Sequence, residues 1–268
     1  MKPLTESPTW PDSWRLSHSF DRLEIYGGPP RTGYAYAYRA RTALTVELLQ
    51  RLVPKGSRVL DVAAAQGNFT LTMAELGYEV TWNDFRSELA DYVKAKHERG
   101  VVHYVPGNAL ELTFREPFDA ILLGEVIEHV AHPDRFLAKI SEFVRPGGWI
   151  ILTTPNGGYV RNPLPRFSDC PNPDQYEALQ FKPNADGHIF LLHDDEIERL
   201  SAAAGLELRE LLHFGNVLTN GHMKLNFLLK VIPTPVIDSL EGFSTRLPAG
   251  AARKLHAGTV AALYKRPV

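Results

Sequence analysis

The fold of this 268-residue chain is indicated by residues 58–70, RVLDVAAAQGNFT. Val59 and Val62 are β-branched residues typical of a buried strand, and the small residues after them predict a tight turn. Asn68 or Thr70 can cap a helix that follows at once. A strand, a turn of small residues and a helix N-terminus in this order let a nucleotide-like ligand approach the main chain. The stretch therefore predicts an α/β fold with a ligand beside the turn.

Strands and helices alternate along the rest of the chain. Strands are predicted near residues 58–63, 78–83, 101–105, 118–123, 148–153, 206–213 and 258–264. Helices are predicted near residues 41–53, 68–76, 86–98, 131–144 and 194–204, where apolar residues recur with helical spacing. Such alternation implies right-handed βαβ units around a parallel sheet.

The chain is interpreted as one domain with additions. Residues 1–40 are rich in proline, glycine and aromatic residues, and we expect them to form a cap or lid over a domain of residues 41–268. Two long segments, 157–192 and 216–250, interrupt the alternation and are interpreted as insertions on the substrate side. The apolar residues 227–232 within the second segment are expected in the core, with a lid hinge or a dimer contact as the alternatives.

Composition limits the class of protein. The chain is 44% hydrophobic and 22% charged with a net charge of −2, as in a soluble globular domain. The balanced charge argues against a nucleic-acid partner. A single cysteine, Cys170, excludes an intramolecular disulfide framework. The N-terminus lacks the apolar core of a signal peptide and no apolar run reaches about 18 residues, so we expect a cytoplasmic protein without a membrane span.

Three further features accompany the first strand and its turn. An acid, Asp84, follows the second predicted strand, a polar loop follows the fourth, and Pro146-Gly147-Gly148 precedes the fifth. With these features the chain resembles the class I S-adenosylmethionine-dependent methyltransferases over residues 41–155. The resemblance implies S-adenosylmethionine as the cofactor. It also implies a Rossmann-like fold, with a seven-stranded, mostly parallel sheet, helices on both faces and an antiparallel last strand.

The turn after the first strand departs from the family pattern. The family usually reads Asp-x-Gly-x-Gly-x-Gly, whereas this chain has alanine at Ala63 and Ala65. Alanine still permits close approach of a ligand if the turn does not need a positive φ. We therefore expect a conservative replacement and a working site.

The resemblance also implies which residues bind the cofactor. Asp84, or Asn83 one position earlier, would accept hydrogen bonds from the ribose hydroxyls, with strand-end capping as the competing interpretation. Asn108 matches the stretch that borders the adenine, although an ordinary turn residue would look the same. The implied cofactor-binding residues are Asp61, Ala63, Ala65, Gln66, Gly67, Asn83, Asp84, Asn108, Ala109 and Gly124.

The most specific local pattern is GEVIEHV at residues 124–130. If a helix begins here, Glu125, Glu128 and His129 lie at i, i+3 and i+4 on one face. The stretch is similar to the Glu-x-x-Glu-His element of ubiquinone-pathway O-methyltransferases and small-RNA 2′-O-methyltransferases, in which these residues and a later histidine bind a divalent cation. Here that histidine would be His188.

The resemblance thus implies the metal ligands Glu125, Glu128, His129 and His188, with His193 as a substitute for His188. Two carboxylates and two imidazoles suit a divalent cation such as Mg²⁺ or Mn²⁺. The same pattern also occurs in methyltransferases in which no metal has a role. A catalytic role of His129 or His188 as a general base, or a purely structural role, is therefore an open alternative.

Three functions are consistent with these patterns. The modest charge and long insertions favour O-methylation of a hydroxyl on a small molecule or glycan. RNA 2′-O-methylation is the alternative, although it needs a basic surface that the sequence does not display. A catalytically silent cofactor-binding or scaffold protein is allowed by the substituted glycines. A dinucleotide dehydrogenase is disfavoured because no Gly-x-Gly-x-x-Gly follows the first strand.

Overall fold

The computed structural model describes residues 1–26, 32–180, 187–220 and 226–267. Within them, seven strands form one sheet in the order β3-β2-β1-β4-β5-β7-β6. The strands are β1 Arg58–Val62, β2 Glu79–Asn83, β3 Val101–Tyr104, β4 Phe118–Gly124, β5 Val144–Pro155, β6 Leu206–Asn216 and β7 His256–Lys265. Strand β7 is antiparallel to β5 and β6, and the other pairs are parallel. The expected sheet with an antiparallel last strand is confirmed.

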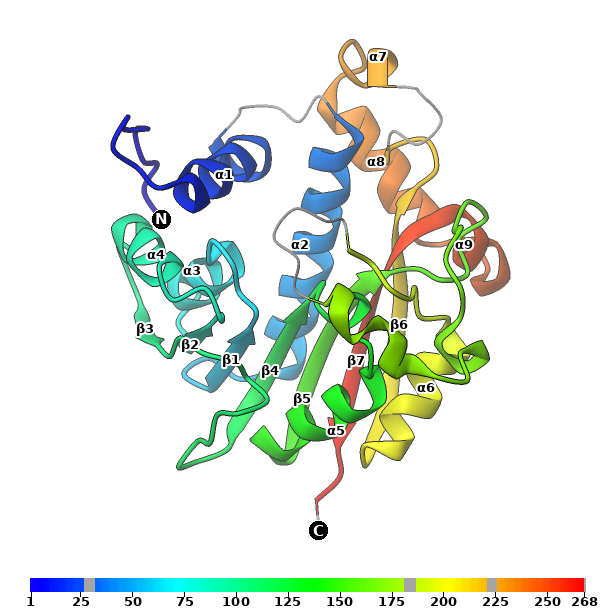
Figure 1. The fold of residues 1–268 in the computed structure, drawn as a ribbon. Coiled ribbons are helices and arrows are strands. Elements are labelled where there is room, and N and C mark those ends of the chain that lie inside the picture. Colours follow the sequence, from blue (N-terminus) through cyan, green and yellow to red (C-terminus); the bar gives the residue numbers. More distant parts are fainter. Residues whose placement is uncertain (27–31, 181–186, 221–225, 268) are drawn as a thin grey trace.

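Helices cover both faces of this sheet (Figure 1). They are α1 Asp12–Asp21, α2 Gly33–Leu52, α3 Asn68–Glu75, α4 Leu89–Lys96, α5 Pro133–Phe143, α6 Asp194–Ala203, α7 Asn226–Leu229, α8 Thr234–Ser244 and α9 Ala249–Leu255. Successive residues of β1 point to opposite faces, as the pleat requires. Val59 packs in one core cluster with Leu48 of α2, and Leu60 packs in another with Leu137 of α5. None of the described helices combines the length and apolarity needed to cross a bilayer.

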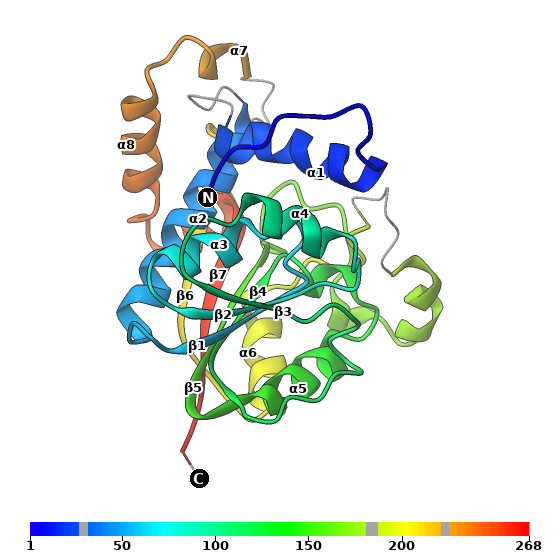
Figure 2. The same ribbon diagram turned by 90° about the vertical axis from the view of Figure 1, so that its left-hand side faces the viewer.

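The parallel strands all end at one edge of the sheet, and this edge carries the additions to the fold. In Figures 1 and 2, helices α1, α7 and α8 lie beyond the carboxyl ends of these strands. Ligands of open α/β sheets bind at this edge. The fold therefore places the predicted site residues at the same end of the sheet as the N-terminal segment.

Helix α2 begins earlier than the sequence pattern predicts. It starts at Gly33, where the Thr32 hydroxyl accepts a hydrogen bond from the Ala35 N–H at 3.3 Å. Tyr36 and Tyr38 are therefore helical and buried, with 5% and 8% of their surface exposed. The cap boundary expected at residue 40 falls inside one continuous helix, while the sequence Gly-Gly-Pro-Pro at residues 27–30 lies outside the described residues. The division into cap and domain remains a prediction.

Both insertions contain helices between loop segments. The first holds 3-10 helices at Phe167–Asp169 and Pro173–Leu179, and its residues 181–186 lie outside the described structure. The second forms α7 and α8. The expectation that residues 227–232 belong to the core is wrong for most of them, because Phe227 is 64% and Val231 74% exposed. Only Leu229 is buried, where it packs on the start of α2.

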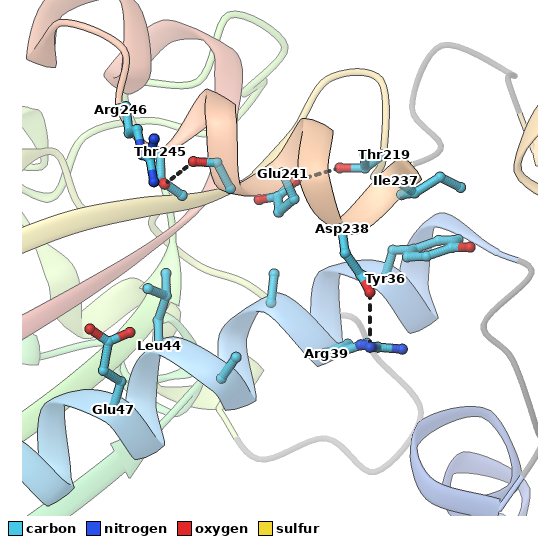
Figure 3. Close-up of a pocket in the computed structure, with 13 residues that line it drawn as sticks. Tyr36, Arg39, Leu44, Glu47, Thr219, Ile237, Asp238, Glu241, Thr245 and Arg246 are labelled. Carbon is cyan, nitrogen blue, oxygen red and sulfur yellow. Dashed lines mark hydrogen bonds and ion pairs between the residues drawn. The ribbon is translucent and has the colours of Figure 1, made fainter. Parts of the chain in front are cut away.

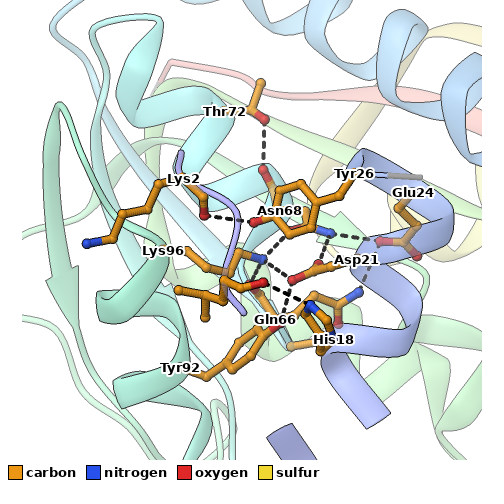
Figure 4. Close-up of polar contacts among 12 residues, drawn as sticks. Lys2, His18, Asp21, Glu24, Tyr26, Gln66, Asn68, Thr72, Tyr92 and Lys96 are labelled. Atoms are coloured by element: carbon orange, nitrogen blue, oxygen red, sulfur yellow. Dashed lines mark hydrogen bonds and ion pairs between the residues drawn. The ribbon is translucent and has the colours of Figure 1, made fainter. Parts of the chain in front are cut away.

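A buried ion pair holds the N-terminal segment on the body of the protein (Figure 4). The Lys96 ammonium donates to Asp21 Oδ2 at 2.8 Å, to the Gln66 carbonyl at 2.9 Å and to Asn68 Oδ1 at 2.5 Å. The Tyr92 hydroxyl donates to Asp21 Oδ2 at 2.6 Å. Both charged side chains are fully buried. This network joins the end of α1 to α4 and to the turn after β1.

We expect Lys96→Met to lower the free energy of unfolding by about 3–5 kcal/mol, because it leaves the buried Asp21 carboxylate without its cation. The matched control is Lys94→Met on the same helix. Lys94 pairs with Asp91 at the surface, where 53% and 72% of the two side chains are exposed. Its loss should change stability by less than about 1 kcal/mol. Urea denaturation measures both values, and equal effects would contradict the expectation.

Candidate functional site

The turn between β1 and α3 has a left-handed backbone. The φ angle is 54° at Ala63, 46° at Ala65 and 72° at Gly67. The expectation that this turn needs no positive φ at its alanines is therefore wrong, and each alanine is held at a cost of roughly 1–2 kcal/mol. Position 67 favours glycine because of its positive φ and also because of the space around it. A β-carbon there would lie 2.6 Å from Val93 Cγ1.

A cleft of about 360 Å³ opens beside this turn, at the carboxyl ends of β1, β2 and β4. It is lined by Phe20, Glu24, Tyr34, Arg41, Ala63, Ala65, Gln66, Asp84, Phe85, Arg86, Gly124, Glu125, Val126, His129 and Gly187. A smaller cavity of about 80 Å³ shares the turn and adds Asp61 to the lining. The structure thus brings most of the predicted cofactor residues together with one predicted metal ligand pair.

The Asp84 carboxylate accepts hydrogen bonds from the turn after β1 and from Arg86. Its Oδ2 accepts hydrogen bonds from the Ala65 N–H at 2.8 Å and from Arg86 Nη2 at 3.0 Å. Its Oδ1 accepts from the N–H and Nε of Arg86, each at 2.9 Å. These four bonds fill the roughly four acceptor sites of a carboxylate. A ribose hydroxyl can therefore bind Asp84 only where the Arg86 side chain gives way.

Gly67 of the turn and three other predicted cofactor residues lie outside the described linings of both the cleft and the smaller cavity. Asn83 is buried, and its amide donates to the carbonyls of Val105 and Gly107 at 2.9 and 3.0 Å. Asn108 is exposed, and its Oδ1 accepts from the main chain two residues later at 3.1 Å. Ala109 is buried in the core. Asn83 thus makes strand-end contacts and Asn108 makes a turn contact. These are the contacts expected from the alternative interpretation, in which neither residue binds the cofactor.

Asp61 joins the end of β1 to the first turns of α3. The Thr70 hydroxyl donates to its Oδ2 at 2.5 Å, and only 2% of Asp61 is exposed. Burial raises the pKa of Asp61 to about 7, because desolvation disfavours the charged form. Burial therefore favours the protonated form of this carboxyl group.

Glu128, His129 and His188 form a group that could hold a metal ion. One ligand atom from each side chain lies within 4.8 Å of the others. Glu128 is fully buried, and Thr154 donates to its Oε2 at 3.1 Å. Its Oε1 has no hydrogen-bond partner among the described residues, which is costly for a buried carboxylate. A cation bound between Oε1 and the two imidazoles would remove this cost.

A main-chain hydrogen bond of the next residue, Ile189, positions His188 beside Glu128 and His129. The N–H of Ile189 donates to the Glu128 carbonyl at 2.7 Å, so the first insertion returns against the turn after β4. The two imidazole rings have centroids 4.8 Å apart. His129 is 30% exposed and lines the cleft. A metal held here would therefore face the ligand in the cleft.

Glu125 is directed elsewhere, since the helix expected to begin there does not form. The backbone at Glu125 is left-handed with φ of 52°, and a 3-10 helix follows at Ile127–His129. The α-helical spacing therefore does not apply. The Glu125 carboxylate forms an ion pair with Arg41 of α2 and stands outside the group of three ligands.

Two other histidines have partners outside the cleft. His193, the substitute ligand, precedes α6, and its N–H donates to the Glu196 carboxylate at 2.9 Å. His132 precedes α5, and its Nε2 lies 2.7 Å from Asp174 Oδ1 and 3.6 Å from Glu177 Oε1. Both acids are exposed. This second group ties the 3-10 helix Pro173–Leu179 to the start of α5.

Besides Arg86, the sequence patterns did not identify two charged residues of the cleft. Arg41 comes from α2 with 13% of its side chain exposed, and its Nε has no hydrogen-bond partner among the described residues. Glu24 comes from a π-helix at Arg22–Tyr26, a rare form that is frequent at functional sites. Neither residue belongs to a recognisable motif, and both reach the cleft only through long-range packing.

A second cavity, of about 450 Å³, separates α2 from α8 (Figure 3). Arg39 of α2 and Asp238 of α8 cross it as an ion pair at 2.9 Å. The remaining walls are both apolar and charged, with Leu44, Ile237 and Glu241 among them. No residue of the turn after β1 is in its described lining.

Sequence comparison gives two kinds of match. The sequence model of a family described as a methyltransferase domain matches residues 35–211. A ubiquinone biosynthesis O-methyltransferase of Caulobacter sp. (strain K31) is 38% identical over 107 residues, which are 38% of this chain and 42% of that protein. One of Burkholderia thailandensis is 30% identical over 160 residues, 58% of this chain and 67% of that protein. The chain thus spans less than half of the Caulobacter relative.

Structural comparison agrees on the fold. A TehB-like S-adenosylmethionine-dependent methyltransferase from Corynebacterium glutamicum superposes with a TM-score of 0.56 at 16% sequence identity. The superposition covers 95% of this chain and 98% of that one. The similarity includes the sheet and the helices on both of its faces.

We expect Ala65→Gly to leave stability unchanged or to raise the free energy of unfolding by up to about 1 kcal/mol. Glycine removes the strain of a positive φ, which stabilises the folded state. It also increases the conformational entropy of the unfolded chain, which offsets part of this stabilisation. The control, Ala138→Gly on the exposed side of α5, should cost about 1 kcal/mol. Thermal and urea unfolding measure both. A loss at Ala65 as large as at Ala138 would argue against the left-handed turn.

We expect metal-free protein to lose stability as pH rises from 5 to 9, partly because of Glu128. Burial raises the pKa of Glu128, and the like charge of Glu125 raises it further. An acid with a raised pKa binds more protons when folded, so its stabilisation is complete below about pH 4.5 and is lost as pH passes its raised pKa. A tenfold difference in proton affinity between the folded and unfolded chain corresponds to about 1.4 kcal/mol of stability.

Urea unfolding of Glu128→Gln in a chelating buffer tests this pH dependence. The variant should lose less stability than the wild type over the same pH range. The exposed Glu142→Gln serves as the control and should keep the wild-type slope. Parallel profiles for wild type and Glu128→Gln would contradict the raised pKa.

Proposed function

We propose that this chain, which belongs to the methyltransferase domain family, is an S-adenosylmethionine-dependent enzyme that methylates a hydroxyl group of a small molecule or glycan with the help of a divalent metal. The proposal is carried by one observation. The orphaned Oε1 of buried Glu128 lies in a group with His129 and His188 at the wall of the cleft.

Methyl transfer from a sulfonium is an in-line displacement, so the protein must align the hydroxyl oxygen, the methyl carbon and the sulfur. Correct positioning supplies much of the rate of such a reaction. The turn at Ala63 and Ala65 and the end of β4 at Gly124 form one wall for the cofactor. His129 stands in the same lining, so an acceptor bound at His129 would lie beside a cofactor held by this wall.

A hydroxyl group is a weak nucleophile at neutral pH. A divalent metal held by Glu128, His129 and His188 would lower the pKa of a coordinated hydroxyl. With one carboxylate and two imidazoles, the donor set fits Mn²⁺ better than Mg²⁺, which prefers oxygen ligands. In the absence of metal, His129 or His188 would accept the hydroxyl proton as a general base.

The acceptor class is supported by the relatives and by charge. The relatives are named as ubiquinone biosynthesis O-methyltransferases, and a net charge of −2 does not favour a polyanionic partner. RNA 2′-O-methylation is therefore the alternative and not the first choice. Gly187 of the first insertion lines the cleft, so this insertion contributes to the acceptor side.

We expect purified protein to bind S-adenosylhomocysteine and about one equivalent of Mn²⁺, and to methylate catechols or vicinal diols in preference to matched amines. Because metal binding requires the ionised carboxylate, Mn²⁺ affinity should rise with pH. Glu128→Gln should lose Mn²⁺ and reduce kcat/KM about 100-fold or more, while Glu142→Gln keeps both. Elemental analysis, calorimetry and a methyl-transfer assay measure these quantities.

The outcomes separate the hypotheses. Full activity after removal of metal would support histidine general-base chemistry instead. Methylation of RNA but of no small molecule would favour the alternative acceptor. Absence of S-adenosylhomocysteine binding would contradict the enzyme function and leave a catalytically silent scaffold.

A further inference from the structure

The N-terminal segment places a carboxylate in the cleft. Asp21, at the end of α1, is fixed by Lys96, and one turn later the π-helix brings in Glu24 (Figure 4). Glu24 lines the main cleft and the smaller cavity behind the turn. Its position is therefore set by buried contacts of its own segment and not by a free terminus.

Glu24 is bonded directly to the cofactor turn and its helix. Its Oε2 accepts hydrogen bonds from Gln66 Nε2 at 3.0 Å and from Asn68 Nδ2 at 2.8 Å. Its Oε1 accepts from the Tyr34 hydroxyl at 2.5 Å. An ionised carboxylate has about four acceptor sites, so Oε1 retains one. That oxygen can accept a further donor from a molecule in the cleft.

The cleft contains three acids in its described lining, and the other two are neutralised. Asp84 is saturated by Arg86 and the turn, and Glu125 pairs with Arg41. Among the described residues, no cation lies within ion-pair distance of Glu24. Burial raises the pKa of Glu24, whereas its hydrogen bonds from Tyr34, Asn68 and Gln66 and the charge of Arg41 act in the opposite direction. A cationic group bound beside Glu24 would compensate its charge.

S-adenosylmethionine carries such a cationic group, the α-ammonium, on the carbon next to its only carboxylate. Two cations line the cleft, and the Arg86 guanidinium is already bound to Asp84. Arg41 keeps unused donors, including a buried Nε, and also lines the smaller cavity with Glu24. A cofactor carboxylate would therefore bind the donors of Arg41 that its ion pair with Glu125 leaves unused. The α-ammonium on the adjacent carbon would then lie on the side of Glu24.

We propose that Glu24 binds the α-ammonium group of S-adenosylmethionine, so that the N-terminal segment supplies a selectivity residue for the amino-acid end of the cofactor. This inference rests on the proposed placement of the cofactor in the cleft. The competing acceptor is Asp61, which shares the smaller cavity with Glu24. Asp61 differs in being almost inaccessible and already bonded to Thr70.

The test compares three ligands by calorimetry: S-adenosylhomocysteine, its analogue without the α-amino group, and 5′-methylthioadenosine, which lacks the whole amino-acid end. Glu24→Gln keeps an oxygen acceptor and removes the charge. This substitution should weaken the binding of S-adenosylhomocysteine about 10- to 100-fold, which corresponds to the loss of one hydrogen bond to a charged group. Binding of the other two ligands should change less than about 2-fold. The exposed Glu6→Gln, from the same segment, should change none of the three.

Each other result overturns the proposal. If Glu24→Gln weakens all three ligands equally, the residue only supports the turn. If Asp61→Asn alone produces the selective loss, the ammonium binds there. If the wild type binds 5′-methylthioadenosine and S-adenosylhomocysteine equally well, the amino-acid end makes no contact. If the wild type binds no ligand, the proposed function fails together with this inference, whereas the first three results leave that function intact.

Discussion

The left-handed turn of residues 63–67 depends on contacts from distant parts of the chain. Two alanines with positive φ are not a conformation that the local sequence prefers. Asp84 accepts from the Ala65 N–H, and the Trp82 indole donates to the Ala65 carbonyl at 3.1 Å. The Lys96 ammonium binds the Gln66 carbonyl. Strand β2, helix α4 and the N-terminal segment thus hold a turn that would otherwise relax.

The same contacts make the cofactor site and the N-terminal segment one unit. The buried Asp21 and Lys96 are costly to desolvate, and their pairing is favourable only with the segment in place. When the segment is docked, Glu24 bonds to the turn and closes one side of the cleft. The family match covers residues 35–211, so this contribution lies outside the part shared with the family.

The two carboxylates of the Glu-x-x-Glu-His element differ because their surroundings differ. Glu125 is neutralised by Arg41 from α2, whereas Glu128 is buried with one oxygen that has no hydrogen-bond partner among the described residues. The charge of Glu125 is therefore compensated within the protein, whereas a bound cation would offset the cost of burying the Glu128 carboxylate. His129 and His188 complete that donor set at the wall of the cleft.

The order of strands and helices, the acid after β2 and the Glu-x-x-Glu-His element were predictable from the sequence by itself, because they depend on local periodicity and spacing. The tertiary structure alone decided the positive φ of the alanines and the separate partners of Glu125 and Glu128. It also brought His188 beside His129 and Glu24 into the cleft. These features arise from contacts between residues far apart in the chain, which no local pattern encodes.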